Sequence, residues 1–106
     1  MTDPRTLQRV KAVADRLRTH YHAQSVILFG SVARGEATGD SDTDLFVIAP
    51  THERFFERSA TVLGLVRDLY PGLALAPIVL TPEEVRQRLD RGDPFIREIV
   101  SAGMVV

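Results

Sequence analysis

The sequence contains no cysteine, so disulfide bonds, thiolate metal ligands and cysteine nucleophiles are all excluded. It also lacks an excess of positive charge, because 13 lysine and arginine residues are offset by 14 aspartate and glutamate residues, for a formal net charge of −1. Nonspecific nucleic-acid binding depends on a basic surface, so we expect no direct contact with nucleic acid.

Long apolar segments are absent as well. No run approaches the ~18 apolar residues that a membrane span needs, and residues 1–5 contain no apolar signal-peptide core. We therefore expect a cytoplasmic protein with no membrane partner.

The composition is that of an ordinary globular protein. With 106 residues, 44% hydrophobic and 25% charged, a single domain over residues 1–106 is expected. Short apolar runs predict strands at residues 25–29, 44–49 and 73–80, with a small edge strand at 104–106. Capping signals and apolar spacing predict helices at residues 4–21, 51–69, 82–91 and 94–100. The alternation predicts an α/β fold.

The second long helix carries three further expectations. We expect Thr51 to open it, and we expect it to end before the Pro-Gly pair at residues 71–72. Phe55 and Phe56 are adjacent, so only one ring can point squarely into the core, and a core position is the expectation for that ring. Arg58 is expected on the solvent-exposed face.

The feature that says most about function is Gly30-Ser31, followed after ten residues by Asp42-Thr43-Asp44. The motif lies between two apolar runs, so a strand leads into a turn and a short helix, and the chain then returns as a second strand. Side chains alternate along a strand, so Asp42 and Asp44 project to the same side if the second strand begins near them.

These residue types suit metal-dependent chemistry on a nucleoside triphosphate. Two close carboxylates repel each other unless a cation lies between them, and oxygen ligands beside a phosphate favour Mg²⁺ or Mn²⁺. Gly30 permits close backbone approach, Ser31 offers N–H groups and a hydroxyl to phosphate oxygens, and Arg34 follows one turn later. The reaction that fits is attack of a hydroxyl on an α-phosphate, with pyrophosphate leaving.

The segment 28–45 closely resembles the minimal nucleotidyltransferase family of the DNA polymerase β superfamily, whose signature is Gly-Ser, ten residues, then Asp-x-Asp. The resemblance implies a single-domain polymerase β-like fold with a mixed sheet flanked by helices. It implies that Gly30 and Ser31 bind the triphosphate of ATP, and that Asp42 and Asp44 are catalytic and hold Mg²⁺. Arg34 is expected to reach the same phosphates because of its place one turn further on. Many members are antitoxins of HEPN-type RNase toxins, and some transfer AMP from ATP to that partner.

One departure from the family pattern concerns a third carboxylate on the third strand. That strand contains no acid here, and the expected position falls at Ala74 or Ala76. Asp40 shares the parity of the two aspartates and would assist only from the loop side. Pro77 cannot donate to a strand ladder, which predicts an edge strand or a bulge.

Three functions follow from these residues. The first is a Mg²⁺-dependent enzyme that transfers AMP to a hydroxyl of a partner protein. The second is a module of the same fold that has lost catalysis and neutralises its partner by contact alone. A transferase for small molecules is disfavoured, because 106 residues leave no room for a substrate domain. With so small a domain, we expect a homo-oligomer or a complex with another protein.

Overall fold

The computed structural model describes residues 3–37, 42–71 and 74–106. Within these residues the chain forms four strands, β1 (Ser25–Phe29), β2 (Thr43–Ile48), β3 (Leu75–Leu80) and β4 (Met104–Val105). The same residues form five helices, α1 (Pro4–His20), α2 (Gly30–Arg34), α3 (Phe55–Val66), α4 (Pro82–Asp90) and α5 (Pro94–Ala102). The α/β fold class predicted from the sequence is confirmed.

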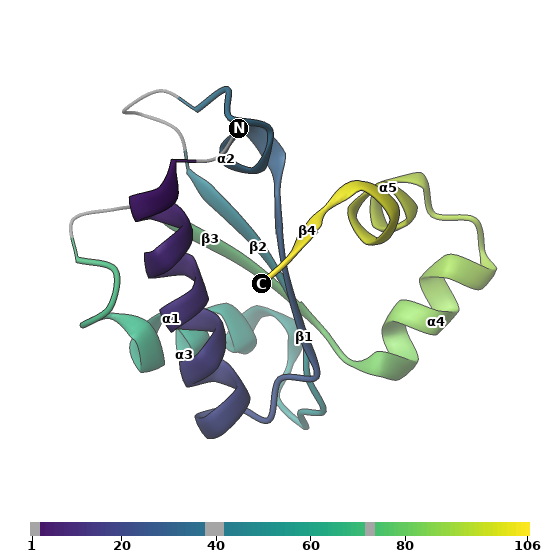
Figure 1. Ribbon diagram of the computed structural model, residues 1–106. Coiled ribbons are helices and arrows are strands. Elements are labelled where there is room, and N and C mark those ends of the chain that lie inside the picture. The colour runs from purple at the N-terminus through teal and green to yellow at the C-terminus, as the bar shows by residue number, and fades with distance from the viewer. Residues whose placement is uncertain (1–2, 38–41, 72–73) are drawn as a thin grey trace.

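The four strands form one mixed sheet in the order β3-β2-β1-β4 (Figure 1). β1 pairs antiparallel with both β2 and β4, whereas β2 and β3 run parallel. β3 is therefore an edge strand, as Pro77 predicted, because a proline lacks the N–H that a further neighbour would need. The short strand expected after Gly103 is β4, which pairs with Ile27 and Leu28.

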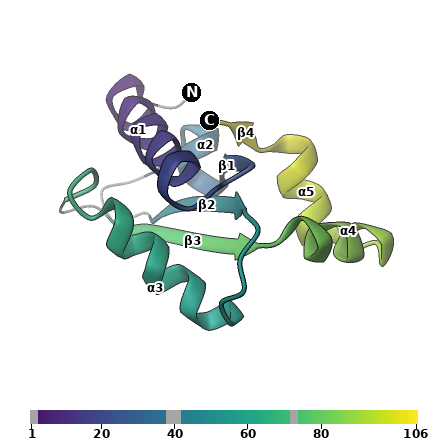
Figure 2. The same cartoon turned by 90° about the horizontal axis from the view of Figure 1, so that it is seen from below.

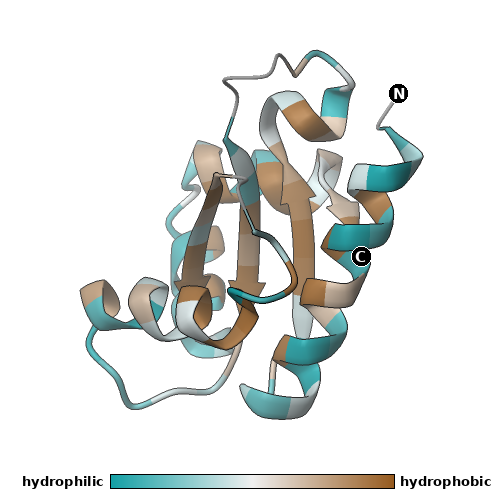
Figure 3. Ribbon diagram, turned by 90° about the vertical axis from the view of Figure 1, so that its left-hand side faces the viewer, coloured by the Kyte–Doolittle hydropathy of each residue, from teal (hydrophilic) through white to brown (hydrophobic). Residues whose placement is uncertain are grey.

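Helices cover both faces of the sheet (Figure 2). The face that carries Leu28, Leu45 and Val47 packs against α1 and α3 in the larger core cluster. The opposite face, with Ile27 and Phe46, packs against α4 and α5 in a second cluster. Coloured by hydropathy, the strands are apolar and the outer sides of the helices are polar (Figure 3). Among the described residues, no helix has both the length and the apolar character needed to cross a membrane.

Local capping signals predicted most helix starts correctly. The Asp3 side chain accepts a hydrogen bond from the Arg5 N–H, Thr81 accepts one from the Glu84 N–H, and Asp93 accepts one from the Phe95 N–H. Each cap is followed by proline at the first helical position, where a missing N–H costs nothing.

The expectations for α3 were wrong in three respects. The helix begins at Phe55 rather than near Thr51, whose hydroxyl instead accepts a hydrogen bond from the Glu53 N–H in a turn. Neither Phe55 nor Phe56 is buried, since 54% and 73% of these residues is exposed. Arg58 is buried rather than solvated, and 6% of it is exposed.

Arg58 is buried because acceptors in three segments of the chain, two of them distant in sequence, satisfy its guanidinium group. Its Nη1 donates to the Val79 carbonyl at 3.1 Å and to the Glu84 carboxylate at 2.6 Å, and its Nε donates to the Glu53 carbonyl at 3.0 Å. A buried charge is tolerated when it is paired and hydrogen-bonded in this way. Arg58 thus ties the first turns of α3 to the end of β3 and the start of α4.

Candidate active site

Gly30 lies directly against the carboxylate of Asp44. Gly30 is the first residue of α2 and has a backbone φ of +76°, a conformation that favours glycine. A Cβ atom placed on it would overlap Oδ2 of Asp44 and lie 3.1 Å from its Cγ. The glycine of the motif is therefore needed both for its backbone angle and for the space that Asp44 occupies.

The short helix α2 follows β1 immediately and carries the other predicted phosphate-binding residues. Ser31 is its second residue and is half-buried, and Arg34 is its last residue and is exposed. Gly35 ends the helix in the left-handed conformation, with its N–H donating to the Val32 carbonyl at 3.1 Å. Arg34 donates to the Glu36 carboxylate at 3.0 Å, an exposed pair of low energetic value.

The sheet register fixes the surroundings of Asp44. Asp44 lies opposite Phe29 of β1 and opposite Ala76 of β3, and all three side chains share the sheet face that α5 covers. Asp42 lies exposed just before β2 begins. Both predicted aspartates are thus at the end of the sheet where β1 passes into α2.

The electrostatics of the pair suit a bound cation. Partial burial raises the pKa of Asp44, the negative charge of Asp42 raises it further, and the positive charge of Arg34 lowers it. Asp42, Asp44 and Arg34 are therefore close enough to interact, and the ionised form of Asp44 is destabilised by its surroundings. A divalent cation on these carboxylate oxygens would remove that penalty.

Tyr70, which the sequence did not indicate, contacts the middle residue of the Asp42-Thr43-Asp44 motif. Thr43, between the two aspartates, points to the opposite face of the sheet, where its hydroxyl lies 2.5 Å from the hydroxyl of Tyr70. Both residues are buried, and the Thr43 N–H donates to the Ala74 carbonyl at 2.9 Å. Nothing in the sequence pattern pairs these two positions, because Tyr70 only precedes a turn signal.

The described residues supply two carboxylates at this place and no third. Ala76 occupies the β3 position opposite Asp44, and within 3–37, 42–71 and 74–106 no group of three or more His, Asp or Glu side chains is placed to hold a metal. Asp40 lies outside the described residues, as does the start predicted for the third strand at residue 73. Asp42 and Asp44 are accordingly the described residues that fit a metal.

A cavity of about 280 Å³ opens beside Gly30, between α2 and α5. Its walls come from the end of β1, from α2, and from α5 with the residue that follows it. The residues that line the cavity include Phe29, Gly30, Arg34, Phe95, Glu98 and Ile99. The cavity adjoins the motif but was not predicted, because α5 begins only at Pro94, far along the sequence from Asp44.

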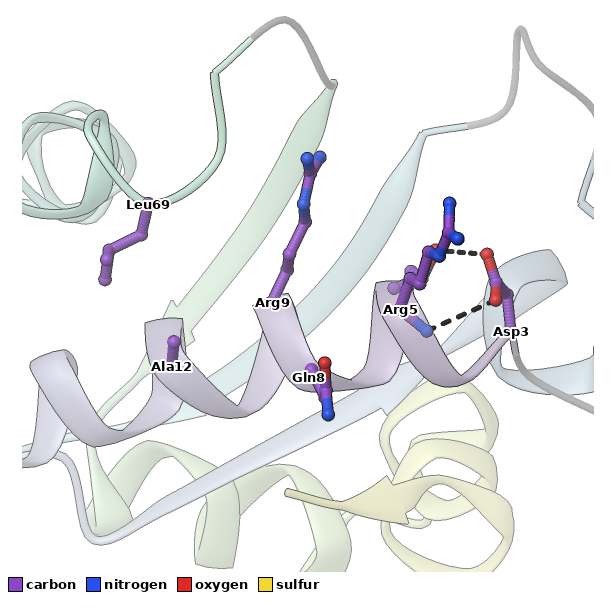
Figure 4. A pocket seen from close by; sticks show the side chains of 7 residues that line it. Asp3, Arg5, Gln8, Arg9, Ala12 and Leu69 are labelled. Atoms are coloured by element: carbon purple, nitrogen blue, oxygen red, sulfur yellow. Dashed lines mark hydrogen bonds between the residues drawn. The ribbon is translucent and has the colours of Figure 1, made fainter.

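A larger hollow of about 560 Å³ runs along the first turns of α1, where Figure 4 shows Arg5 and Arg9 extending from the same side of the helix. Asp3 contributes a carboxylate to the lining of this hollow, and the same carboxylate already caps α1. Among the residues that the structure describes, no pair of acids comparable to Asp42 and Asp44 lines this hollow, so the motif is the better candidate for the chemistry.

The fold and this site define the class of protein. The chain belongs to the nucleotidyltransferase domain family, whose sequence model matches residues 10–105. This membership confirms the family resemblance and supports a transferase that takes a nucleoside triphosphate.

Two individual proteins are similar to the chain. A Methanocaldococcus jannaschii protein named "Putative protein adenylyltransferase MJ1379" is 26% identical over 105 residues, covering 95% of this chain and 97% of that protein. The crystal structure of a "putative nucleotidyltransferase" from Sulfolobus solfataricus is similar with a TM-score of 0.56 and 24% identity, covering 78% of this chain and 73% of the other. The second similarity supports the fold alone.

Proposed function

We propose that this protein is a Mg²⁺-dependent adenylyltransferase that transfers AMP from ATP to a hydroxyl group of a partner protein. The observation that carries the proposal is the contact of Gly30 with the Asp44 carboxylate beside Asp42. A backbone able to approach phosphate beside two acids able to hold a metal is what reaction at an α-phosphate requires, and this supports the proposal.

Each residue of the motif has a proposed role. Asp42 and Asp44 would hold Mg²⁺, with Mn²⁺ as the alternative, and Gly30, Ser31 and Arg34 would bind the triphosphate. The bound cation would neutralise the triphosphate and stabilise charge on the leaving pyrophosphate. The N–H groups and hydroxyl at Ser31 would donate to phosphate oxygens, and the Arg34 guanidinium would reach the same anion.

The reaction balances without a further reactant. The acceptor oxygen bonds to the α-phosphorus of ATP, and the bond from that phosphorus to the bridging oxygen of the β-phosphate breaks. Pyrophosphate leaves, and the hydroxyl proton passes to water. The site would orient the triphosphate for this attack, because phosphates bound at Gly30 would lie beside the Asp44 carboxylate that Gly30 contacts.

The acceptor is proposed to be a protein. The Methanocaldococcus jannaschii relative, which matches over almost its whole length, carries the name of a protein adenylyltransferase, and this supports the choice. We further propose a HEPN-type toxin as the partner, with this chain as its antitoxin. Sedimentation of the protein alone and with the product of a neighbouring HEPN gene tests this step, and a strict monomer that ignores that product would contradict it.

A second candidate function is a catalytically weak or inactive binding module that neutralises the partner by contact. Ala76 favours it, because the β3 position opposite Asp44 carries no acid that could complete a second metal site.

Asparagine variants separate the two functions. Asp42→Asn and Asp44→Asn should each abolish Mg²⁺-dependent ATP binding, measured by calorimetry, and the transfer of labelled AMP to the partner. The fold should be kept or slightly stabilised, since repulsion between the carboxylates is relieved. Asp90→Asn, an exposed acid on α4, is the matched control and should behave as wild type.

The outcome decides between enzyme and module. Wild-type protein that fails to bind Mg²⁺-ATP at millimolar nucleotide would end the adenylyltransferase proposal. Asparagine variants that still neutralise the partner as well as wild type would favour the module.

A further inference from the structure

The cavity between α2 and α5 is continuous with the proposed phosphate site. Gly30 lines the cavity and also touches the Asp44 carboxylate, and Arg34, at the other end of the same short helix α2, lines the cavity as well. Phe29, which also lines the cavity, lies opposite Asp44 in the β1–β2 register, so both side chains are on one sheet face. A nucleotide held by its phosphates at Gly30 therefore has this cavity as its neighbour.

We infer that the cavity binds the purine base of the nucleotide, with the base stacked on Phe95. The inference rests on the proposed function and names the part of the substrate that this cavity takes. Its volume of about 280 Å³ lies near the lower limit of small-ligand pockets, roughly 300 Å³, and suits one flat ring system.

Phe95 is exposed, and its ring contacts one other aromatic ring. It lies in the first turn of α5, 52% of it is exposed, and its N–H donates to the Asp93 carboxylate at 3.0 Å. Its ring meets the Phe29 ring edge-on, with centroids 5.9 Å apart and planes at 82°. In that geometry Phe29 covers at most one face of the Phe95 ring, so a face remains for stacking with a base.

The charges of Glu98 and Arg34 determine which end of the nucleotide enters the cavity. Glu98 lies three residues after Phe95 on α5 and so shares its side of the helix. An ionised carboxylate only accepts hydrogen bonds and repels phosphate, whereas Arg34 on the facing helix α2 attracts it. The phosphates therefore remain at Gly30, and the Glu98 carboxylate accepts a hydrogen bond from the amino group of the base.

The test compares two probes that differ by the nucleoside. Calorimetry measures binding of Mg²⁺-ATP and of Mg²⁺-tripolyphosphate to wild type, Phe95→Leu and Phe95→Ala. Phe95→Ala should weaken ATP binding about tenfold or more, because stacking on an aromatic side chain contributes ~1–3 kcal/mol per base. Tripolyphosphate binding should stay unchanged. Phe56→Ala, another exposed phenylalanine but on α3, is the control and should bind both probes as wild type does.

A second variant tests the base contact. Glu98→Ala should bind ATP and purine riboside triphosphate, which lacks the amino group, with equal affinity, whereas wild type should prefer ATP. Thermal unfolding verifies that each variant is folded.

Failure of the base-binding inference can be distinguished from failure of the proposed function. Unchanged ATP affinity in Phe95→Ala, with AMP transfer slowed, would overturn the inference and assign the cavity to the acceptor. An equal loss for both probes would also overturn it, because Phe95 would then act through the fold. Wild type that binds neither probe would overturn the proposed function itself.

Discussion

The hydroxyl groups of Tyr70 and Thr43 lie 2.5 Å apart in the core, directly behind the two aspartates of the motif. The backbone of Thr43 is held as well, because its N–H donates a hydrogen bond to the Ala74 carbonyl. The strand start that carries Asp42 and Asp44 is therefore fixed from the core, although neither Tyr70 nor Thr43 faces the proposed substrate.

We expect Tyr70→Phe to lower both stability and nucleotide affinity. The Thr43 hydroxyl would be left buried without this partner, which costs about 1–3 kcal/mol in the free energy of unfolding. Freed from its anchor, the segment with Asp42 and Asp44 should bind Mg²⁺-ATP several-fold more weakly. Chemical denaturation and calorimetry measure the two effects. Adding Thr43→Val should recover most of the stability, because both polar partners are then absent.

Tyr21→Phe is the matched control for this prediction. The Tyr21 hydroxyl donates to the Glu53 carboxylate at 2.8 Å, and Tyr21 is buried. Tyr21 precedes the start of β1 and Glu53 follows the end of β2, so this pair lies at the opposite end of these strands from the motif. This variant should lose stability and keep its affinity for Mg²⁺-ATP. Equal losses of affinity in the two variants would show that Tyr70 has no positioning role.

Gly30→Ala should be damaging for two separate reasons. A residue with a side chain is strained at φ +76°, which costs roughly 1–3 kcal/mol of stability. The added Cβ would also displace the Asp44 carboxylate, so Mg²⁺-ATP binding should be lost. Gly92→Ala has the same strain at φ +75°, but its Cβ would meet only Arg97 Nη2 at an ordinary 3.7 Å. It should therefore lose stability without losing binding, and a loss of binding there would contradict the assignment.

Much of the fold was predictable because its signals are local. The apolar runs gave strands close to β1, β2 and β3, and the caps at Thr81 and Asp93 gave the starts of α4 and α5. The start of α3 was not predictable in this way, because a Thr51–Glu53 turn competes with the helix for the same residues. The burial of Arg58 depends on acceptors in β3 and α4 that no local pattern reveals.

The site divides in the same way. The spacing of Gly30 and Asp44 was sufficient to predict that the two belong together, because the motif lies in the connection between two strands that pair with each other. The cavity depends on α5 folding back over β1, and the anchor of Thr43 depends on Tyr70 beyond α3. Both are contacts between distant segments, so they become visible only in three dimensions.

Acid should destabilise the protein partly through Glu84. The hydrogen bond from Arg58 lowers the pKa of the Glu84 carboxyl, and partial burial opposes this effect. A carboxyl whose pKa is lower in the folded state stabilises the fold above its ordinary pKa, about 4.3, and that contribution is lost as the pH falls through the folded value. The free energy of unfolding should therefore decrease below about pH 5, as measured by urea denaturation at each pH.

Glu84→Gln isolates this contribution. The variant should be less stable than wild type at pH 7, because the buried Arg58 loses its countercharge, and its stability should change less between pH 5 and the lowest pH tested. Glu83→Gln, an exposed neighbour on α4, is the control and should follow the wild-type curve. A wild-type pH dependence in Glu84→Gln would remove Glu84 from the explanation.

Ala76→Asp should raise the rate of AMP transfer. Ala76 lies opposite Asp44 in the parallel register, on the same sheet face, so an acid there would complete a set of three carboxylates with Asp42. We expect an increase of at least about tenfold, equivalent to ~1.4 kcal/mol of transition-state stabilisation. Without divalent cation the extra charge should lower the thermal stability, and Mg²⁺ should restore it, since three close carboxylates repel one another.

Ala76→Asn is the control for this last change, because it has nearly the size of aspartate and carries no charge. It should leave the transfer rate at the wild-type level, and Mg²⁺ should not alter its stability relative to wild type. A folded Ala76→Asp variant that binds Mg²⁺-ATP and transfers AMP no faster than wild type would show that a missing carboxylate does not limit the reaction. If wild type is itself inactive, that result would favour the binding module, because adding the acid to β3 would then not be enough to produce an enzyme.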